Sequence, residues 1–258
     1  ACLFVLAMCV CLLAGCGGGE TKEDTAGKTE TESGNQEESQ PAGDKVLRYQ
    51  VSTIVDSMDP ALSNDYTSCG VLSQCMMGLF TKDENGAPAP GMAESEEKSE
   101  DGLTLTFHIR EDAVWANGDP VTAHDFVYAW RRVADPKMAS DYQFFIQTAC
   151  IVNADEVVAG EKPVEDLGVE AKDDKTLEVK LSSPCSIFDY LMTSTCFLPL
   201  SQDFVEGCGD KFATSPETIL CNGPFKISAY EPSTMTIEEV KNDKFFDASK
   251  VKLDGVEF

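Results

Sequence analysis

A strand, a turn and a helix follow one another without interruption in residues 104–136. In the first part, apolar and polar side chains alternate, which is the period of a strand with one buried face. Turn dipeptides fill residues 117–120. Thr122 can cap the following helix, with Asp125 in the capping-box position. The helix must end before Pro136, because the residue before a proline avoids the α region. The stretch predicts a domain that mixes strands and helices.

Similar patterns predict further elements along the chain. A hairpin turn is expected at residues 83–86, and a second hairpin contains the alternating residues 176–181. Apolar residues at helical spacing between Val71 and Leu79 predict a helix. No internal repeat is visible, which excludes a solenoid. The remaining predicted elements are strands at Val46–Val51 and from Met235 onwards, and helices at residues 184–192 and 204–211.

The composition excludes several classes of function. The chain has 258 residues, of which 42% are hydrophobic, enough for one large domain or two small ones. Its 45 acidic and 20 basic residues give a net charge of −25. This charge argues against a nucleic-acid partner, which demands basic patches, and disfavours attraction to anionic lipid. It is typical of a soluble, well-solvated protein.

The first residues have the features of an export signal. Residues 1–14 are almost entirely apolar but too few to span a bilayer, so they are interpreted as the apolar region of a secretion signal. Leu13-Ala14-Gly15-Cys16 resembles the lipobox of a bacterial lipoprotein, whose cysteine carries lipid. An ordinary signal peptide and a short buried helix are the alternatives. Because the chain begins without methionine and without a positively charged region, its true start is expected to lie further upstream.

The residues after Cys16 support the lipoprotein interpretation. Up to Asp44 they are polar and acidic, a composition that cannot bury enough apolar surface to become ordered. A lipid-bearing cysteine followed by a tether is what a membrane-anchored protein needs. We therefore predict a signal peptide in residues 1–15, and the lipidated cysteine with its acidic tether in residues 16–44.

Seven cysteines lie beyond the tether. Their number is odd and no two have C-x-x-C spacing. Export usually implies disulfides, but several of these cysteines stand among apolar residues. We interpret them mainly as small buried apolar side chains. They are Cys69, Cys75, Cys150, Cys185, Cys196, Cys208 and Cys221.

Residues 107–131 read FHIREDAVWANGDPVTAHDFVYAWR. They resemble, in register, the motif FxLRxxxxWxxGxPVTAxDFVYxWxR of the extracytoplasmic peptide-binding proteins of ABC importers, the oligopeptide- and dipeptide-binding proteins of family 5. Ile109 replaces the leucine of the motif. The resemblance extends from about Val46 to Phe258. Other matching segments are DSMDP at 56–60, PAPGMAE at 88–94, NGPFKI at 222–227 and NDKFFD at 242–247.

The resemblance implies a mixed α/β fold of the periplasmic-binding-protein type, with two lobes around a hinge. Residues 45–76 and 200–258 would form parts of the first main lobe, and residues 77–199 an inserted accessory subdomain. The chain covers about half of the family's length and is expected to be truncated before the second main lobe. Residues 45–258 alone are therefore not expected to bind peptide appreciably.

The sequence holds little that suggests catalysis or metal binding. The two histidines, His108 and His124, stand on polar positions without metal-ligand spacing, so both are predicted to be surface side chains. No nucleophile, zinc-protease, phosphate-loop or dinucleotide motif is present. Trp130 lies on the apolar helix face and is expected in the core, whereas Trp115 fits the core and a ligand-stacking role about equally. We expect no enzyme activity, no cofactor and no metal.

The function implied by the resemblance is capture of an oligopeptide or dipeptide and its delivery to ABC permease subunits. An extended peptide would add to the protein as a strand, with wet pockets for its side chains. By position, the strand-like residues Asn64, Asp65 and Tyr66 would lie along the peptide. Tyr142 would line the site, and Asn222 with Gly223 would lie near the floor of the cleft. Each could also be a loop residue without a ligand, and Asn64 stands where the family commonly has an acid.

The protein is thus expected to be a monomer outside the cell membrane, held there by its lipid. Alternatives remain. The same fold hosts other cargoes, so a nickel chelate, haem or a sugar could replace the peptide. A structural surface lipoprotein and a secreted hydrolase are the alternatives from other classes.

Overall fold

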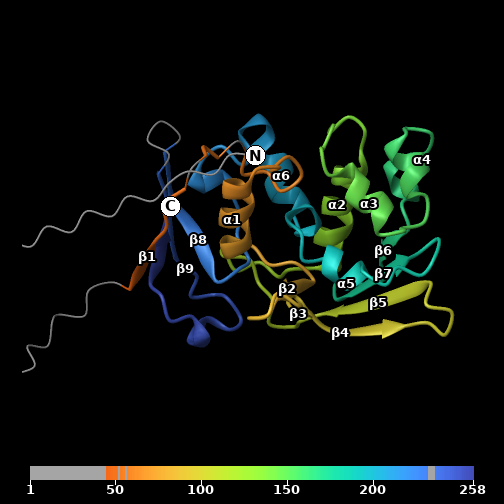
Figure 1. The fold of residues 1–258 in the computed structure, drawn as a ribbon, viewed down its shortest axis with the longest axis horizontal. Helices are drawn as coiled ribbons and strands as arrows, with labels where there is room; N and C mark the ends of the chain where they lie inside the picture. The colour runs from red at the N-terminus through yellow and green to blue at the C-terminus, as the bar shows by residue number, and fades with distance from the viewer. Residues whose placement is uncertain (1–44, 52, 56, 232–235) are drawn as a thin grey trace, which may run out of the picture. The chain divides into compact units, whose positions relative to one another are not determined.

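The computed structural model describes residues 45–258 except residues 52, 56 and 232–235 (Figure 1). The predicted signal peptide, the lipid attachment at Cys16 and the tether lie outside the described residues. Strands and helices are mixed, as predicted. None of the helices within the described ranges is both long and apolar enough to cross a membrane.

One sheet joins the two ends of the described chain, and we call it the terminal sheet (Figure 1). β1 pairs in parallel with β10, and the other neighbours pair antiparallel. The predicted first strand is shorter than expected and ends at Arg48, although the Tyr49 amide still donates to the Glu257 carbonyl over 2.8 Å. The strands, in spatial order, are β1 (Val46–Arg48), β10 (Gly255–Glu257), β9 (Thr236–Lys241) and β8 (Phe225–Glu231).

A second, fully antiparallel sheet is built from the middle of the chain, and we call it the middle sheet. Leu105, Phe107 and Ile109 of β5 are buried, which confirms the alternation predicted for this strand. Phe107 pairs in register with Leu177 of β7, so the predicted strand at residues 104–109 and the strand of the second predicted hairpin share one apolar face. The strands, in spatial order, are β4 (Ala93–Lys98), β5 (Thr104–Ile109), β7 (Thr176–Lys180) and β6 (Val169–Ala171).

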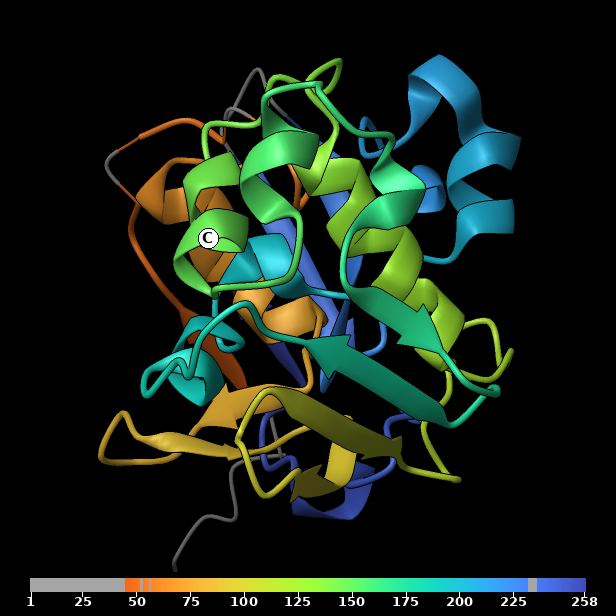
Figure 2. The same ribbon diagram turned by 90° about the vertical axis from the view of Figure 1, so that its right-hand side faces the viewer.

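Helix α2 (Ala123–Ala134) packs against β6 and β7, as Figure 2 shows. Its predicted capping is confirmed, because the Thr122 amide donates to the Asp125 carboxylate over 2.8 Å. Trp130 is fully buried on its inner face, and its Nε1 donates to the carbonyl of Phe197 over 3.0 Å. The predicted core role of Trp130 is therefore confirmed.

Helix α1 (Tyr66–Cys75) packs against β8 of the terminal sheet. The prediction that one helical face continues to Leu79 is wrong. The helix stops at Cys75 because Met76 is extended, at φ −129° and ψ 153°. Leu79 is nevertheless fully buried.

Shorter elements connect these parts. The helix predicted at residues 184–192 is confined to α5, since Ile187 has a non-helical backbone. The helix predicted at residues 204–211 starts two residues earlier, as α6 (Gln202–Cys208), and continues to Lys211 as the 3₁₀ turn η3 (Gly209–Lys211). The α-helical part ends before Gly209, whose φ is +53°. The remaining elements are the hairpin β2 (Phe80–Lys82) and β3 (Pro88–Pro90), the helices α3 (Gln143–Thr148), α4 (Ala154–Val158), α5 (Phe188–Leu191) and α6 (Gln202–Cys208), and the short 3₁₀ turns η1 (Val164–Asp166), η2 (Thr195–Phe197), η3 (Gly209–Lys211), η4 (Pro216–Thr218) and η5 (Ala248–Lys250).

The seven cysteines beyond the tether are all free thiols. Cys75, Cys196 and Cys221 are buried, as the apolar interpretation predicts. The other four are half-buried, so the interpretation as small buried side chains does not hold for them.

Candidate functional site

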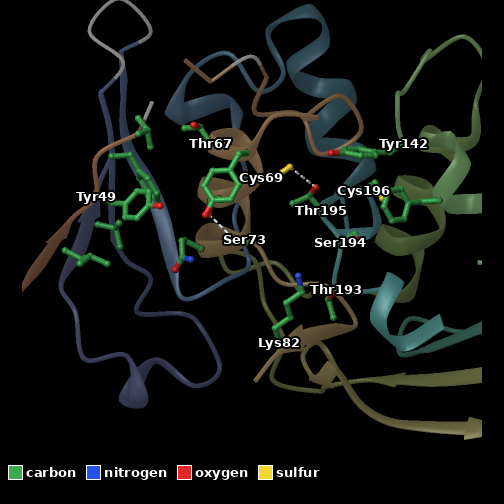
Figure 3. Close-up of a pocket in the computed structure, with 18 residues that line it drawn as sticks. Tyr49, Thr67, Cys69, Ser73, Lys82, Tyr142, Thr193, Ser194, Thr195 and Cys196 are labelled. Atoms are coloured by element: carbon green, nitrogen blue, oxygen red, sulfur yellow. Dashed lines mark hydrogen bonds between the residues drawn. The ribbon is translucent and has the colours of Figure 1, made fainter. Parts of the chain in front are cut away.

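A pocket of about 620 Å³ opens between the terminal sheet, helix α1 and residues 193–196. This volume lies in the range of small-molecule sites. Figure 3 shows Tyr49 on the side of the terminal sheet, Tyr142 and Cys196 on the opposite side, and Lys82 below them. The pocket walls therefore come from segments that are far apart in the sequence.

Aromatic side chains form the wall on the terminal-sheet side. The rings of Tyr49 and Phe258 meet edge to face with centroids 6.1 Å apart, because the parallel pairing of β1 with β10 brings them together. Tyr66, the first residue of α1, is 80% exposed and faces the same space. The neighbouring Tyr66 side chain raises the pKa of Tyr49. This wall offers exposed ring faces together with hydroxyl groups.

The opposite wall combines a thiol, hydroxyls and further rings. The Cys69 thiol lies 3.5 Å from the Thr195 hydroxyl, and the rings of Tyr142 and Phe145 are 5.4 Å apart. Burial, followed by the neighbouring Cys69, raises the pKa of Tyr142. Burial raises the pKa of the Cys196 thiol to about 12. Both groups thus stay uncharged at neutral pH.

The loop before α1 is fixed by a buried ion pair. Arg132 of α2 holds Asp59 through two hydrogen bonds, 2.7 and 2.6 Å long, and Asp59 is only 5% exposed. The Asp59 carboxylate also accepts a hydrogen bond from the backbone amide of Ala61 over 3.0 Å. A bidentate arginine–carboxylate pair is geometrically specific. The Arg132–Asp59 pair therefore fixes the loop that leads to Asn64.

Asn64, Asp65 and Tyr66 were predicted to be strand-like, and the structure corrects this. Asp65 has an extended backbone but serves as the N-cap of α1, accepting a hydrogen bond from the Ser68 amide over 2.8 Å. Tyr66 is already helical, since this cap satisfies a free amide of the first turn. Of the three, Tyr66 lines the pocket.

The structure brings Asn64 and Tyr142 together at the pocket's edge. The Asn64 amide donates to Asp141, and the Tyr142 hydroxyl donates to the Asn64 carbonyl over 3.5 Å. Tyr142 itself lines the pocket. These contacts join the loop before α1 to the segment before α3.

Asn222 and Gly223 do not line this pocket. Asn222 is fully buried, and its side chain binds the backbone of Met77 through two hydrogen bonds of 3.0 and 2.9 Å. A Cβ atom on Gly223 would lie 2.8 Å from the backbone of Cys75. Both residues hold the end of α1 close to the segment that leads into β8.

Several pocket residues escaped the sequence analysis. Tyr49 directly follows β1 and Phe258 directly follows β10. Neither belongs to a recognised motif, and only the pairing of β1 with β10 makes them neighbours. Residues 193–196 and Lys82 also carried no signal. The one available indication was that Tyr49 is an aromatic residue within the predicted strand Val46–Val51.

No metal site is found among the described residues, where no group of three or more His, Cys, Asp or Glu side chains could hold an ion. Both histidines are on the surface, where His108 lies 3.4 Å from Glu97 and His124 lies 3.6 Å from Asp174. Trp115 is 1% exposed and donates to Asp125 over 3.2 Å, so its possible ligand-stacking role is ruled out.

Comparison with known proteins gives one consistent result. The sequence model of the bacterial extracellular solute-binding proteins, family 5 (middle region), matches residues 87–258. The periplasmic oligopeptide-binding protein OppA of Salmonella typhimurium is 40% identical over 204 residues, 79% of this chain and 37% of that protein. The probable deoxycholate-binding periplasmic protein YgiS of Escherichia coli is 33% identical over 217 residues, 84% of this chain and 40% of that protein.

Solved structures agree. OppA of Listeria monocytogenes bound to peptide superposes with a TM-score of 0.78 at 38% identity, covering 84% of this chain and 42% of that one. The chain thus spans less than half the length of the proteins it matches.

Proposed function

This chain belongs to the bacterial extracellular solute-binding proteins of family 5, and from that premise we propose that it captures oligopeptides or dipeptides for an ABC importer. The protein would bind its ligand outside the cell membrane and present it to the permease subunits. Binding and release would involve no covalent chemistry. The observation that carries the proposal is the pocket of about 620 Å³ beside β1, with its exposed rings and uncharged hydroxyls.

The pocket chemistry suits a peptide of variable sequence. Rings such as Tyr49 and Tyr66 offer apolar contact together with a hydrogen-bonding hydroxyl. Among the described strands, β1 has a partner on one side only, so an extended chain could be added near its free edge. Backbone hydrogen bonds and adaptable, wet contacts would give affinity with little dependence on side chains.

We assign ligand contact to Tyr66 and Tyr142, which line the pocket, and to Asn64 at its edge. Asp65 would contribute as the N-cap that positions Tyr66. Asn222 and Gly223 would act indirectly, by fixing the end of α1. In a family-length chain, the segments that these residues do not supply would close over the ligand by a hinge motion. We further propose that residues 77–199, which include the middle sheet, form an accessory subdomain inserted into the first main lobe (residues 45–76 and 200–258).

Calorimetry on the intact gene product tests the function. We expect short peptides of unrelated sequence to bind with similar affinity, and N-methylated versions to bind much more weakly because they lack backbone donors. Tight binding of free sugars, haem or metal chelates without any response to peptides would overturn the proposal.

A second cargo has a specific observation in its favour. YgiS, named as a probable deoxycholate-binding protein, matches 84% of this chain, and Leu47, Val51 and Val256 add apolar surface to the pocket. The same calorimetric panel should include deoxycholate. Binding of deoxycholate that peptides fail to displace would favour this alternative.

We propose that Cys16 carries the lipid that anchors the protein at the outer face of the membrane. The support is the sequence Leu13-Ala14-Gly15-Cys16 followed by a polar tether. Buried acyl chains contribute about 0.8 kcal/mol per methylene, so the mature protein should partition into detergent. The Cys16→Ser variant should remain in the aqueous phase or stay unprocessed. Partitioning identical to that of the unaltered protein would contradict the anchor.

A further inference from the structure

The charges around the pocket are distributed unlike those of the whole chain. Acidic residues outnumber basic ones by 45 to 20 in the sequence. The pocket lining nevertheless contains no aspartate or glutamate, and its one charged side chain is Lys82. A strongly acidic protein therefore presents a positive charge at this pocket.

Lys82 ends strand β2, and Figure 3 shows its side chain pointing up towards the pocket from below. Its ammonium group lies 5.6 Å from the centroid of the Tyr190 ring. Such a contact holds a cation in place without removing its charge. The register of β2 with β3, in which Lys82 lies opposite Pro88, fixes the strand that carries it.

The nearby acids do not neutralise Lys82. Asp189, the neighbour of Tyr190 in sequence, lies 3.6 Å from Lys98, which also contacts Glu96 over 3.1 Å. Within the described ranges, Lys82 has no carboxylate within ion-pair distance. Its charge is thus available to a ligand.

We propose that Lys82 makes this pocket favour ligands that place a carboxylate beside it. This inference rests on the proposed peptide-capture function and adds a modest preference for a carboxylate to a specificity that is otherwise broad. The carboxylate could belong to an acidic side chain of the peptide or to its C-terminus. In either case, the lysine would contribute a charge-assisted hydrogen bond and would attract the anion during its approach.

The test uses the intact gene product and four peptides. Ala-Ala-Glu-Ala and Ala-Ala-Gln-Ala, each with a free and an amidated C-terminus, separate the two sources of the carboxylate. We expect a preference of about fivefold for one carboxylate over its neutral counterpart, and this preference should shrink at high salt. Glu over Gln would indicate side-chain recognition, and free over amidated would indicate the C-terminus.

Variants then assign the preference to Lys82. Lys82→Met should abolish it and Lys82→Glu should reverse it. Lys252→Glu makes the same change of charge at an exposed lysine outside the pocket lining, and should leave the preference intact. Equal affinities for all four peptides, or a preference that survives Lys82→Glu, would overturn the inference while leaving peptide capture in place. If none of the four peptides binds, peptide capture itself fails, and the inference fails with it.

Discussion

In the middle sheet, the inward positions of the central strands β5 and β7 are apolar and buried, as with Leu105 and Phe107 of β5. In the terminal sheet, the inward position next to Ile237 on β9 is Glu239, which is 2% exposed. Neither of its carboxylate oxygens finds a hydrogen-bond partner in the described part of the chain. Burial, with a smaller contribution from Cys221, raises the pKa of Glu239 to about 9.

The two sheets also differ in what they expose. Glu239 pairs in register with Val256, which lines the pocket, and Leu47 on the neighbouring strand is 49% exposed. The rule that inward positions are apolar is followed in β5 and β7 of the middle sheet and broken at Glu239 of β9, whose partner Val256 lines the pocket. Proteins typically break such rules at functional sites. The difference fits the proposal made above, in which the central strands of the middle sheet stabilise the fold and the terminal sheet borders the ligand pocket.

A matched pair of leucines should show the largest contrast between the sheets. Leu105→Ala in the middle sheet removes a side chain that is 2% exposed and should lower the free energy of unfolding by about 2–5 kcal/mol. Leu47→Ala in the terminal sheet should lower it by less than about 1 kcal/mol. Urea denaturation measures both. Equal losses would show that the two sheets are packed alike.

The buried carboxyl of Glu239 predicts an effect of pH on stability. Its ordinary pKa is 4.5 and its folded-state pKa is about 9. Between these values the unfolded chain ionises while the folded protein keeps the proton, so stability falls as pH rises. Glu239→Gln should remove this loss. Between pH 5 and pH 8, the free energy of unfolding of the variant should rise by about 2 kcal/mol relative to that of the unaltered protein. This is less than the value obtained by multiplying the whole pKa shift by about 1.4 kcal/mol per pKa unit.

Glu238→Gln is the control for this prediction, because Glu238 is the exposed neighbour on the same strand. Its stability should follow pH as that of the unaltered protein does. A Glu239→Gln variant whose stability also follows pH unchanged would mean that Glu239 is ionised in the folded state, and the contrast between the sheets would weaken.

The smallest expected effect on stability lies on the pocket wall. Tyr66 is 80% exposed, so Tyr66→Ala should change the free energy of unfolding by no more than about 0.5 kcal/mol. Peptide affinity should fall by about fivefold, because a ring contact of about 1 kcal/mol is lost. Ile187→Ala, at a 50% exposed position outside the pocket lining, should alter neither quantity. A large loss of stability in Tyr66→Ala would show that this wall is structural.

The two central strands of the middle sheet and helix α2 could be predicted because their signals are local. The alternation in β5, the Thr122 cap with Asp125 and the turns all lie within a few residues of the elements that they define. The terminal sheet depends on contacts that the sequence does not announce, such as Val46 with Gly255. The site followed the same division: the resemblance to the peptide-binding family led to Tyr66 and Tyr142. Tyr49, Phe258 and Lys82 became neighbours of the pocket only through tertiary structure.

The end of α1 shows how a correct local pattern can mislead. Apolar residues continue at helical spacing to Leu79, yet the helix ends at Cys75. The reason is that the Asn222 side chain, 145 residues away in sequence, hydrogen-bonds both the amide and the carbonyl of Met77. Such a long-range hydrogen bond is invisible to periodicity. Likewise, the burial of Glu239 contradicts the expectation that a charged residue faces water.

The central claim is that the pocket beside the terminal sheet is the ligand site, and its own thiol reports on it most directly. Cys69 lines the pocket, whereas Cys208 is half-buried outside it. The rate of N-ethylmaleimide labelling at each cysteine can be measured by mass spectrometry in the intact gene product, with and without a saturating tetrapeptide. We predict that the peptide slows labelling of Cys69 at least severalfold and leaves Cys208 unchanged. Unchanged labelling of Cys69, under conditions where calorimetry shows the peptide bound, would place the ligand elsewhere and contradict the account.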